Sequence, residues 1–215
     1  MGANRYAELR ENYRQGGLLE SEALGDPIAQ FHRWFDEVLA QGVLEANAMS
    51  LATASAAGVP DVRIVLLKAL DARGFCFFTN YESRKGRELA ENPQAALCFH
   101  WKEFERQVRA AGTVEKLSTS ESAAYFTQRP RASQIGAWAS AQSQVIAGRE
   151  TLEAARRHYE QEFVDQLVPM PPFWGGYLLR PIEFEFWQGR PGRLHDRLHY
   201  HRRSDNTWQI QRLSP

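Results

Sequence analysis

Groups that bind anions are concentrated in a few short segments of this chain of 215 residues. One of them is Ser83-Arg84-Lys85-Gly86, which stands where we expect a helix to begin. Backbone N–H groups, the helix dipole and two cationic side chains would converge there, and a phosphate group needs these donors. Because cations are otherwise unfavourable at a helix N-terminus, this segment predicts a phosphate site.

A second cationic pair, Arg63 and Lys68, interrupts an apolar segment, Arg63-Ile-Val-Leu-Leu-Lys68. Both side chains are costly to bury without a partner. Their odd separation on a regular strand would send them to opposite faces, where they could bind two different anions. The alternative is that each side chain extends to solvent at its own end of the strand.

A phenol, a guanidinium and a hydroxyl follow one another as Tyr125, Arg129 and Ser133. Tyr125 and Arg129 are four residues apart, so they are neighbours on the surface of one helix. Ser133 follows Pro130, where the chain must turn. The three groups predict a second phosphate-binding cup. Stacking of Tyr125 on Arg129 at the helix end would give the same spacing.

Basic side chains alternate along a third segment, in which Arg193, His195, Arg197, His199 and His201 would share one strand face. Adjacent cations repel each other, so either an anionic ligand or full solvation of an edge strand is needed to explain them. A metal site built from the three histidines is disfavoured, because the two arginines would repel a divalent cation. No carboxylate shares that face, and we therefore predict no metal.

Common catalytic devices are missing from the sequence. It contains no GxSxG nucleophile elbow, no distinctive pair of carboxylates, and neither glycine-rich phosphate loop, GxGxxG or GxxxxGK[ST]. Aromatic residues make up 12% of the chain. Several anion-binding groups without a nucleophile or base fit an enzyme whose cofactor carries the difficult chemistry.

The elements that must position these groups can be read from periodicity and turn signals. Asp26 and Pro27 predict the start of a helix that Gly42 ends, and Ser118 with Glu121 has the spacing of a capping box. Further helices are expected from Ser83 to about Asn92 and over 148–163. The expected strands are 48–55, 62–70, 75–79, 95–101, 107–116, 176–179, 182–187, 194–202 and about 208–213. Many strands with a few inserted helices indicate an α+β fold, a β-barrel with peripheral helices.

Composition excludes several classes of protein. Equal numbers of cationic and anionic residues, 26 of each, argue against a nucleic-acid binder, and no apolar run is long enough for a membrane span. Cys76 and Cys98 lie far apart without a CxxC pair and are expected to be free thiols. We therefore expect a cytoplasmic protein with no nucleic-acid or membrane partner.

Taken together, these segments resemble the pyridoxine/pyridoxamine 5′-phosphate oxidase family. The run from Phe184 to Arg197 matches the C-terminal signature of that family in full. The similarity covers about residues 10–215 in order and spacing, and its other segments are RIVLLK, FFTN, SRKGRE, ERQVR, YFTQRPRASQIGAWAS, PPFWGGY and the ending WQIQRLSP.

The resemblance implies an FMN-binding split β-barrel that forms a homodimer, with FMN at the subunit interface. It divides the chain into a mobile N-terminal lid, residues 1–20, and a single domain, residues 21–215. The flavin contacts that it implies are Arg63, Ile64, Val65, Leu66, Leu67, Lys68, Phe78, Thr79, Arg84, Lys85, Gln107, Gln142, Ser143, Trp187 and Arg197. Phe78 stands where many members have Tyr, so a contact there is expected from the backbone.

The implied substrates are pyridoxine 5′-phosphate and pyridoxamine 5′-phosphate, oxidised to pyridoxal 5′-phosphate with O2 as acceptor. Catalytic roles over the pyridine ring fall to Arg193 and His195. The implied substrate contacts are Arg10, Tyr13, Lys68, Tyr125, Arg129, Ser133, Arg193 and His195. Two alternatives remain open, a related FMN oxidase of phenazine biosynthesis and a non-catalytic carrier of FMN or pyridoxal phosphate.

Overall fold

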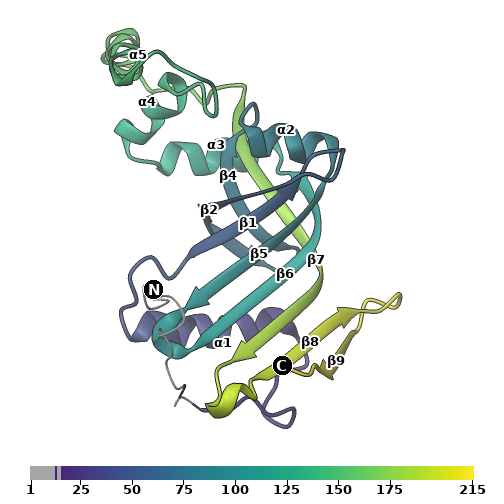
Figure 1. Ribbon diagram of the computed structural model, residues 1–215. Helices are drawn as coiled ribbons and strands as arrows, with labels where there is room; N and C mark the ends of the chain where they lie inside the picture. The colour runs from purple at the N-terminus through teal and green to yellow at the C-terminus, as the bar shows by residue number, and fades with distance from the viewer. Residues whose placement is uncertain (1–12, 14–15) are drawn as a thin grey trace, which may run out of the picture. The chain divides into compact units, whose positions relative to one another are not determined.

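The computed structural model describes Tyr13 and residues 16–215. Most of the predicted N-terminal lid, including Arg10, lies outside the described residues. Within them, the helices are α1 (Pro27–Ala40), α2 (Arg84–Glu91), α3 (Thr119–Gln128), α4 (Arg131–Ala139) and α5 (Arg149–Glu162) (Figure 1). The strands are β1 (Ala48–Ala54), β2 (Pro60–Leu66), β3 (Ala69–Asp71), β4 (Gly74–Asn80), β5 (Gln94–Trp101), β6 (Arg106–Lys116), β7 (Trp174–Gln188), β8 (Asp196–Arg202) and β9 (Trp208–Arg212). None of the helices in this part of the chain is long and apolar enough to cross a membrane.

The nine described strands form one sheet with the order β2-β1-β5-β6-β7-β4-β3, and β8 and β9 continue it from β7. β4 pairs antiparallel with β3 and with the first part of β7, while the second part of β7 pairs antiparallel with β8. The pairs β3–β4, β4–β7, β7–β8 and β8–β9 are all antiparallel, whereas a βαβ unit joins parallel strands. The predicted α+β class is therefore confirmed.

Chain contacts divide the protein into two compact units, and β1, β5, β6 and β7 contribute residues to both. The first unit contains the described residues up to 49, together with 97–110 and 182–215. Its core forms where α1 buries one apolar face. The Phe31 ring lies 4.9 Å from that of Phe99, and the Trp34 ring lies 5.3 Å from that of Phe186. Asp26 caps α1 by accepting a hydrogen bond from the backbone N–H of Ile28, as predicted.

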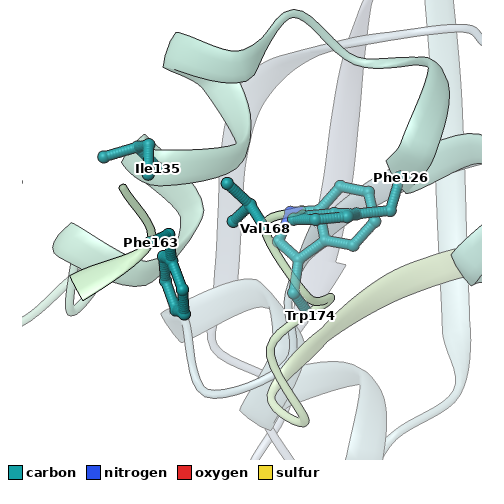
Figure 2. Close-up of a cluster of buried hydrophobic side chains, with 5 residues drawn as sticks. All are labelled: Phe126, Ile135, Phe163, Val168 and Trp174. Carbon is teal, nitrogen blue, oxygen red and sulfur yellow. The ribbon is translucent and has the colours of Figure 1, made fainter. Parts of the chain in front are cut away.

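The second unit contains residues 50–96 and 111–181, and so holds α2 to α5. Its helical part is built on a buried cluster, shown in Figure 2, of Phe126, Ile135, Phe163, Val168 and Trp174. α3 begins with the predicted capping box of Ser118 and Glu121, and α4 packs against α5. The C-terminal turn of α3 and the N-terminal turn of α4 line the site described below.

Gly86 is required by close packing at the start of α2. A Cβ at this position would lie 2.1 Å from the carbonyl oxygen of Tyr81, which is far inside van der Waals contact. Any side chain here would push the helix away from the chain before it. The Ser-Arg-Lys-Gly segment can therefore start a helix at this place only with glycine.

Two predicted strand boundaries are wrong. The segment 62–70 divides into β2 and β3, with Leu67 and Lys68 between them. Conversely, the two strands predicted over 176–187 are one strand, β7, which continues through Pro181. Proline lacks a backbone N–H, but the ladder with β4 ends at Leu179 and the ladder with β8 begins at Glu183. Pro181 lies between these two ladders, so it removes no hydrogen bond from either.

Arg193 and His195 do not lie on a strand, which corrects the predicted alternation from Arg193 to His201. Residues 191–193 form a 3-10 turn in which Gly192 and Arg193 have φ angles of 66° and 63°, and β8 begins only at Asp196. A left-handed backbone cannot continue a strand. Helix α4 was not predicted, and its N-cap, Pro130, lacks the side-chain oxygen of the residues that usually start a helix.

Candidate functional site

A cavity of about 710 Å³ opens in the second unit, a size typical of small-molecule sites. β2, β4, α3 and α4 supply most of its wall. Of the residues predicted for the flavin or the substrate, the cavity is lined by Ile64, Val65, Leu66, Lys68, Phe78, Thr79, Lys85, Tyr125, Arg129, Ser133 and Gln142. The other lining residues, which the sequence analysis did not single out, are Asn80, Gln128, Pro130, Gly136, Ala137, Ser140 and Trp174.

The charged side chains that line this cavity are all cationic. Lys68, Lys85 and Arg129 line it, whereas its described lining contains no Asp or Glu. Lys68 is exposed, but Lys85 is buried with only neutral hydrogen-bond acceptors and Arg129 is half-buried, and such cations in a concave site attract an anion. The cavity is therefore suited to an anionic ligand.

Lys85 lies at one end of the cavity and is 8% exposed. Its Nζ donates to Gln142 Oε1 at 3.0 Å and to Thr79 Oγ1 at 3.3 Å, and lies 3.5 Å from Ser83 Oγ. All three acceptors are neutral. Burial, followed by the positive charge of Arg63, lowers the pKa of Lys85 below its usual 10.5. An anion bound here would restore the favourable environment that the ammonium group has lost.

Arg129 lines the cavity from the helical part, as the C-cap of α3. Its Nη1 is buried and has no hydrogen-bond partner among the described residues. Burial lowers the pKa of its guanidinium. Tyr125, one turn earlier, stacks on Phe78 with ring centroids 3.9 Å apart, so the alternative of Tyr125 stacking on Arg129 is not what the structure shows. Because a buried donor without an acceptor is costly, this position favours a ligand that accepts a hydrogen bond.

The first turn of α4 adds further donors beside Arg129. Pro130 is its N-cap and supplies no side-chain cap, and Ser133 lines the cavity from the third helical position. The backbone N–H groups of Ser133 and Gln134 donate to the Pro130 carbonyl oxygen, so this turn offers an anion the Ser133 hydroxyl and the positive end of the helix dipole. α4 is anchored through Arg131, which donates to the carbonyl oxygens of Phe163 and Gln166 at 2.5 and 2.8 Å.

Arg63 and Arg84, both predicted for the flavin phosphate, do not line this cavity. Arg63 donates to Thr53 Oγ1 at 2.5 Å, to Asp61 at 2.6 Å and to Glu88 at 3.3 Å. Arg84 pairs with Asp61 and Glu88 at 3.1 and 3.0 Å. The two arginines thus belong to an ion-pair network. Leu67 and Ser143 also lie outside the cavity lining.

A second group of predicted residues lies in the first unit. Tyr13 makes edge contacts with Trp187 and His195, at centroid distances of 5.6 and 5.3 Å. His195 Nδ1 accepts a hydrogen bond of 3.1 Å from the backbone N–H of Arg190, so the neutral ring carries its proton on Nε2. Burial, and then the charge of Arg193, lowers the pKa of His195 below 6.5. This arrangement keeps the imidazole neutral with one free donor.

Arg197 and Gln107 complete the predicted set in this unit. Arg197 makes a two-pronged contact with Glu185, at 3.1 and 2.8 Å, and donates to the carbonyl oxygen of Ser214. Glu185 is 7% exposed and also pairs with Arg109 at 3.4 Å. Gln107 is half-buried on β6. Arg197 is therefore held rigidly by a buried carboxylate.

Comparison with known proteins identifies the class first. A solved structure of PhzG from Burkholderia lata, in complex with tetrahydrophenazine-1-carboxylic acid, matches with a TM-score of 0.88 and 32% identity over 94% of this chain and 99% of that one. An FMN-binding protein from Nostoc punctiforme, described as related to pyridoxamine 5′-phosphate oxidase, matches with a TM-score of 0.69 at 18% identity, over 86% of this chain and 97% of that one. The fold is thus the split β-barrel of these proteins, as the sequence predicted.

The family follows from closer relatives. The model described as pyridoxamine 5′-phosphate oxidase matches residues 35–162, and that of the pyridoxine 5′-phosphate oxidase C-terminal dimerisation region matches 174–215. Pyridoxine/pyridoxamine 5′-phosphate oxidases from Cupriavidus taiwanensis and Bordetella avium are each 57% identical over 97% of this chain, and over 98% and 99% of their own lengths. This chain belongs to the pyridoxamine 5′-phosphate oxidase family of oxidoreductases.

Proposed function

We propose that this chain is an FMN-dependent oxidase that converts pyridoxine 5′-phosphate and pyridoxamine 5′-phosphate to pyridoxal 5′-phosphate. O2 would be reduced to H2O2 in both reactions, and the amine substrate would also consume water and release ammonia. The observation that carries the proposal is the buried, unpartnered Nη1 of Arg129 in a cationic cavity. A phosphate monoester has the charge and the acceptors that this cavity lacks.

The substrate phosphate would be bound at the Arg129 end. Arg129, Tyr125 and Ser133 offer a guanidinium and two hydroxyl groups, and Lys68 adds a positive charge to the same cavity. These contacts are made equally in the ground state and the transition state, so they should govern KM and leave kcat largely unchanged.

The residues also fit FMN. Lys85 is a buried cation with only neutral acceptors, and Thr79 and Gln142 converge on it, so this end of the cavity would hold the FMN phosphate. The chemistry that FMN supplies when bound is acceptance of a hydride equivalent from C4′ of the substrate and delivery of two electrons to O2. Arg63 and Arg84 would support this site through their ion pairs with Asp61 and Glu88, or would exchange these carboxylates for the FMN phosphate.

We assign the contacts with the pyridine ring of the substrate to Arg193 and His195. With Nδ1 of His195 occupied by the Arg190 N–H, its Nε2–H is the group that can donate to the ring oxygen of the substrate. The charge of Arg193 would stabilise negative charge that develops on the ring. Variants of these two residues should therefore lose kcat and keep their flavin. We also propose a homodimer, because residues 174–215 match a dimerisation region.

Turnover with release of H2O2 tests the proposal. The purified protein should be yellow, with one FMN per chain, and should form one H2O2 per pyridoxal 5′-phosphate. Arg129→Ala should lower kcat/KM for pyridoxine 5′-phosphate about ten- to a hundredfold, the cost of one charged hydrogen bond. Arg149→Ala is the matched control, since this exposed arginine pairs with Glu153 and lies outside the cavity.

Two outcomes would replace the proposal. Bound flavin without turnover of either phosphorylated substrate would indicate a carrier. Faster oxidation of a reduced phenazine carboxylate than of pyridoxine 5′-phosphate would indicate the phenazine reaction, which the 32% identity to PhzG brings into consideration.

A further inference from the structure

Arg129 is held in the cavity wall by aromatic rings. Its guanidinium carbon lies 4.7 Å from the centroid of the Trp174 ring and 5.7 Å from that of Phe126. None of the ion pairs found in the described chain includes Arg129. A cation this close to an indole face is attracted by the negative potential of the ring.

The Trp174 ring is fixed from several sides. It is 6% exposed, belongs to the buried cluster of Figure 2, and makes an edge contact with Phe126 at 5.1 Å. Phe78 and Tyr125 lie nearly parallel to it, at interplanar angles of 16° and 7°. Trp174 also begins β7, where it pairs with Asn80 of β4. The indole is therefore held in one position, and it supports the long, otherwise flexible side chain of Arg129.

A ring and a carboxylate would hold this arginine with different consequences. A carboxylate would occupy the N–H donors of the guanidinium and cancel its charge, whereas a ring binds the flat face and leaves the donors at the edge free. The unpartnered Nη1 is what the second arrangement produces. Holding the guanidinium in place before the ligand arrives also lowers the entropy lost on binding.

We propose that Trp174 is the positioning residue of the phosphate site: its indole face holds the Arg129 guanidinium with its donors free, and so sets the preference for phosphorylated over unphosphorylated ligands. The inference rests on the proposed function and deepens it. Trp174 also lines the cavity, but an effect that acts through Arg129 weakens only ligands that carry the phosphate group.

Direct binding to the holoenzyme separates this role from simple packing. Dissociation constants for pyridoxal 5′-phosphate and for pyridoxal would be measured by fluorescence titration. In Trp174→Leu the constant for pyridoxal 5′-phosphate should rise about tenfold, the effect of one partly buried cation–π contact, while that for pyridoxal changes less than twofold. In Trp174→Phe, which keeps an aromatic face, most of the affinity should return. Steady-state kinetics of Trp174→Leu should show a raised KM for pyridoxine 5′-phosphate with kcat retained.

The matched control is Trp138→Leu. Trp138 packs against the same cluster but contacts Tyr159, Phe163 and Phe173, and its Nε1 donates to the carbonyl oxygen of Pro169. This variant should keep both dissociation constants. Because Trp174→Leu could fail to fold, site-specific fluorotryptophans at position 174 provide a second series. Each added fluorine weakens the negative face without changing the shape, so the affinity for pyridoxal 5′-phosphate should fall stepwise.

Equal weakening of both ligands in Trp174→Leu, or a flat fluorination series, would overturn the role of Trp174 and leave the proposed function intact. A wild-type protein that binds pyridoxal as tightly as pyridoxal 5′-phosphate would overturn the proposed function, and the role of Trp174 with it.

Discussion

The ammonium group of Lys85 donates to the side-chain oxygen of Gln142 at 3.0 Å, across 57 positions of sequence. The contact places a neutral amide on a buried cation, although a carboxylate would bind it more strongly. The side chain of Lys85 thus has hydrogen-bond acceptors, but none of them carries a negative charge. A bound anion would supply the counter-charge that these neutral acceptors lack, and the first prediction follows from this.

Replacing Lys85 with Met should affect stability and ligand binding in opposite directions. Met has a similar shape and no charge to desolvate, so the FMN-free protein should unfold at the same temperature or higher. Affinity for FMN should fall at least tenfold, because a charge-assisted contact with the phosphate is lost. Calorimetry and flavin-fluorescence titration measure the two effects. Arg87→Met is the control, since this exposed residue of α2 lies outside the cavity. Unchanged FMN affinity in Lys85→Met would contradict the assignment.

Gly136→Ala should also separate stability from binding. Gly136 lies inside α4 and lines the cavity, and a Cβ there would have no atom within 4 Å. Alanine should stabilise the helix by about 1 kcal/mol, the difference in helix propensity. The added methyl group would occupy space beside the ligand, so affinity for pyridoxal 5′-phosphate should fall several-fold. Gly25→Ala, at an equally open position outside the cavity, should leave that affinity unchanged. A variant that binds as tightly as the wild type would show that the ligand does not pass along α4.

The pKa of His195 should respond to the charge of Arg193. Burial and this charge hold it below 6.5, so the folded chain resists protonation while the unfolded chain accepts a proton at the usual pH. The stability that the neutral ring contributes is therefore complete above pH 6.5 and is lost as the pH falls toward the lower folded value. Arg193→Gln should raise the pKa, measured by following the His195 Cε1 proton in an NMR titration. Arg202→Gln, which removes an exposed charge of β8, should leave the pKa of His195 unchanged. A rise of this pKa in both variants would refute a specific effect of Arg193.

Glu88→Gln should reveal the role of the ion-pair network. Burial alone would raise the pKa of Glu88, but hydrogen bonds from Thr53, Arg84 and Arg63 lower it below 4.5. The resulting stability is present above pH 4.5 and is lost as the pH falls through the folded pKa. The neutral amide should cost about 1–3 kcal/mol near pH 7 and flatten the acid side of the stability profile.

Urea unfolding at several pH values measures this effect of Glu88. Glu115→Gln is the matched control, because Glu115 also pairs with an arginine, Arg180, but at an exposed site where ion pairs contribute little. An equal loss of stability in both variants would show that burial of the network has no energetic consequence.

The sequence by itself determined the local structure of this protein and the chemistry available to it. The caps at Asp26 and Ser118, most strand positions and the phosphate-binding residue types depend on neighbours within a few positions, which periodicity and capping rules describe. The same residues carry the family resemblance, because its motifs are short and contiguous.

Only the tertiary structure decided which charges are neutralised and which stay free. Arg63 pairs with Asp61 two positions away, and α2 adds Glu88 from 25 positions away, whereas Arg129 meets the Trp174 ring from the start of β7 and no carboxylate among the described residues. The odd spacing of Arg63 and Lys68 suggested two environments but could not say which was the binding site. Desolvation and pairing energies depend on the atoms that folding places around a group. Sequence spacing does not contain that information once the partners lie on different elements.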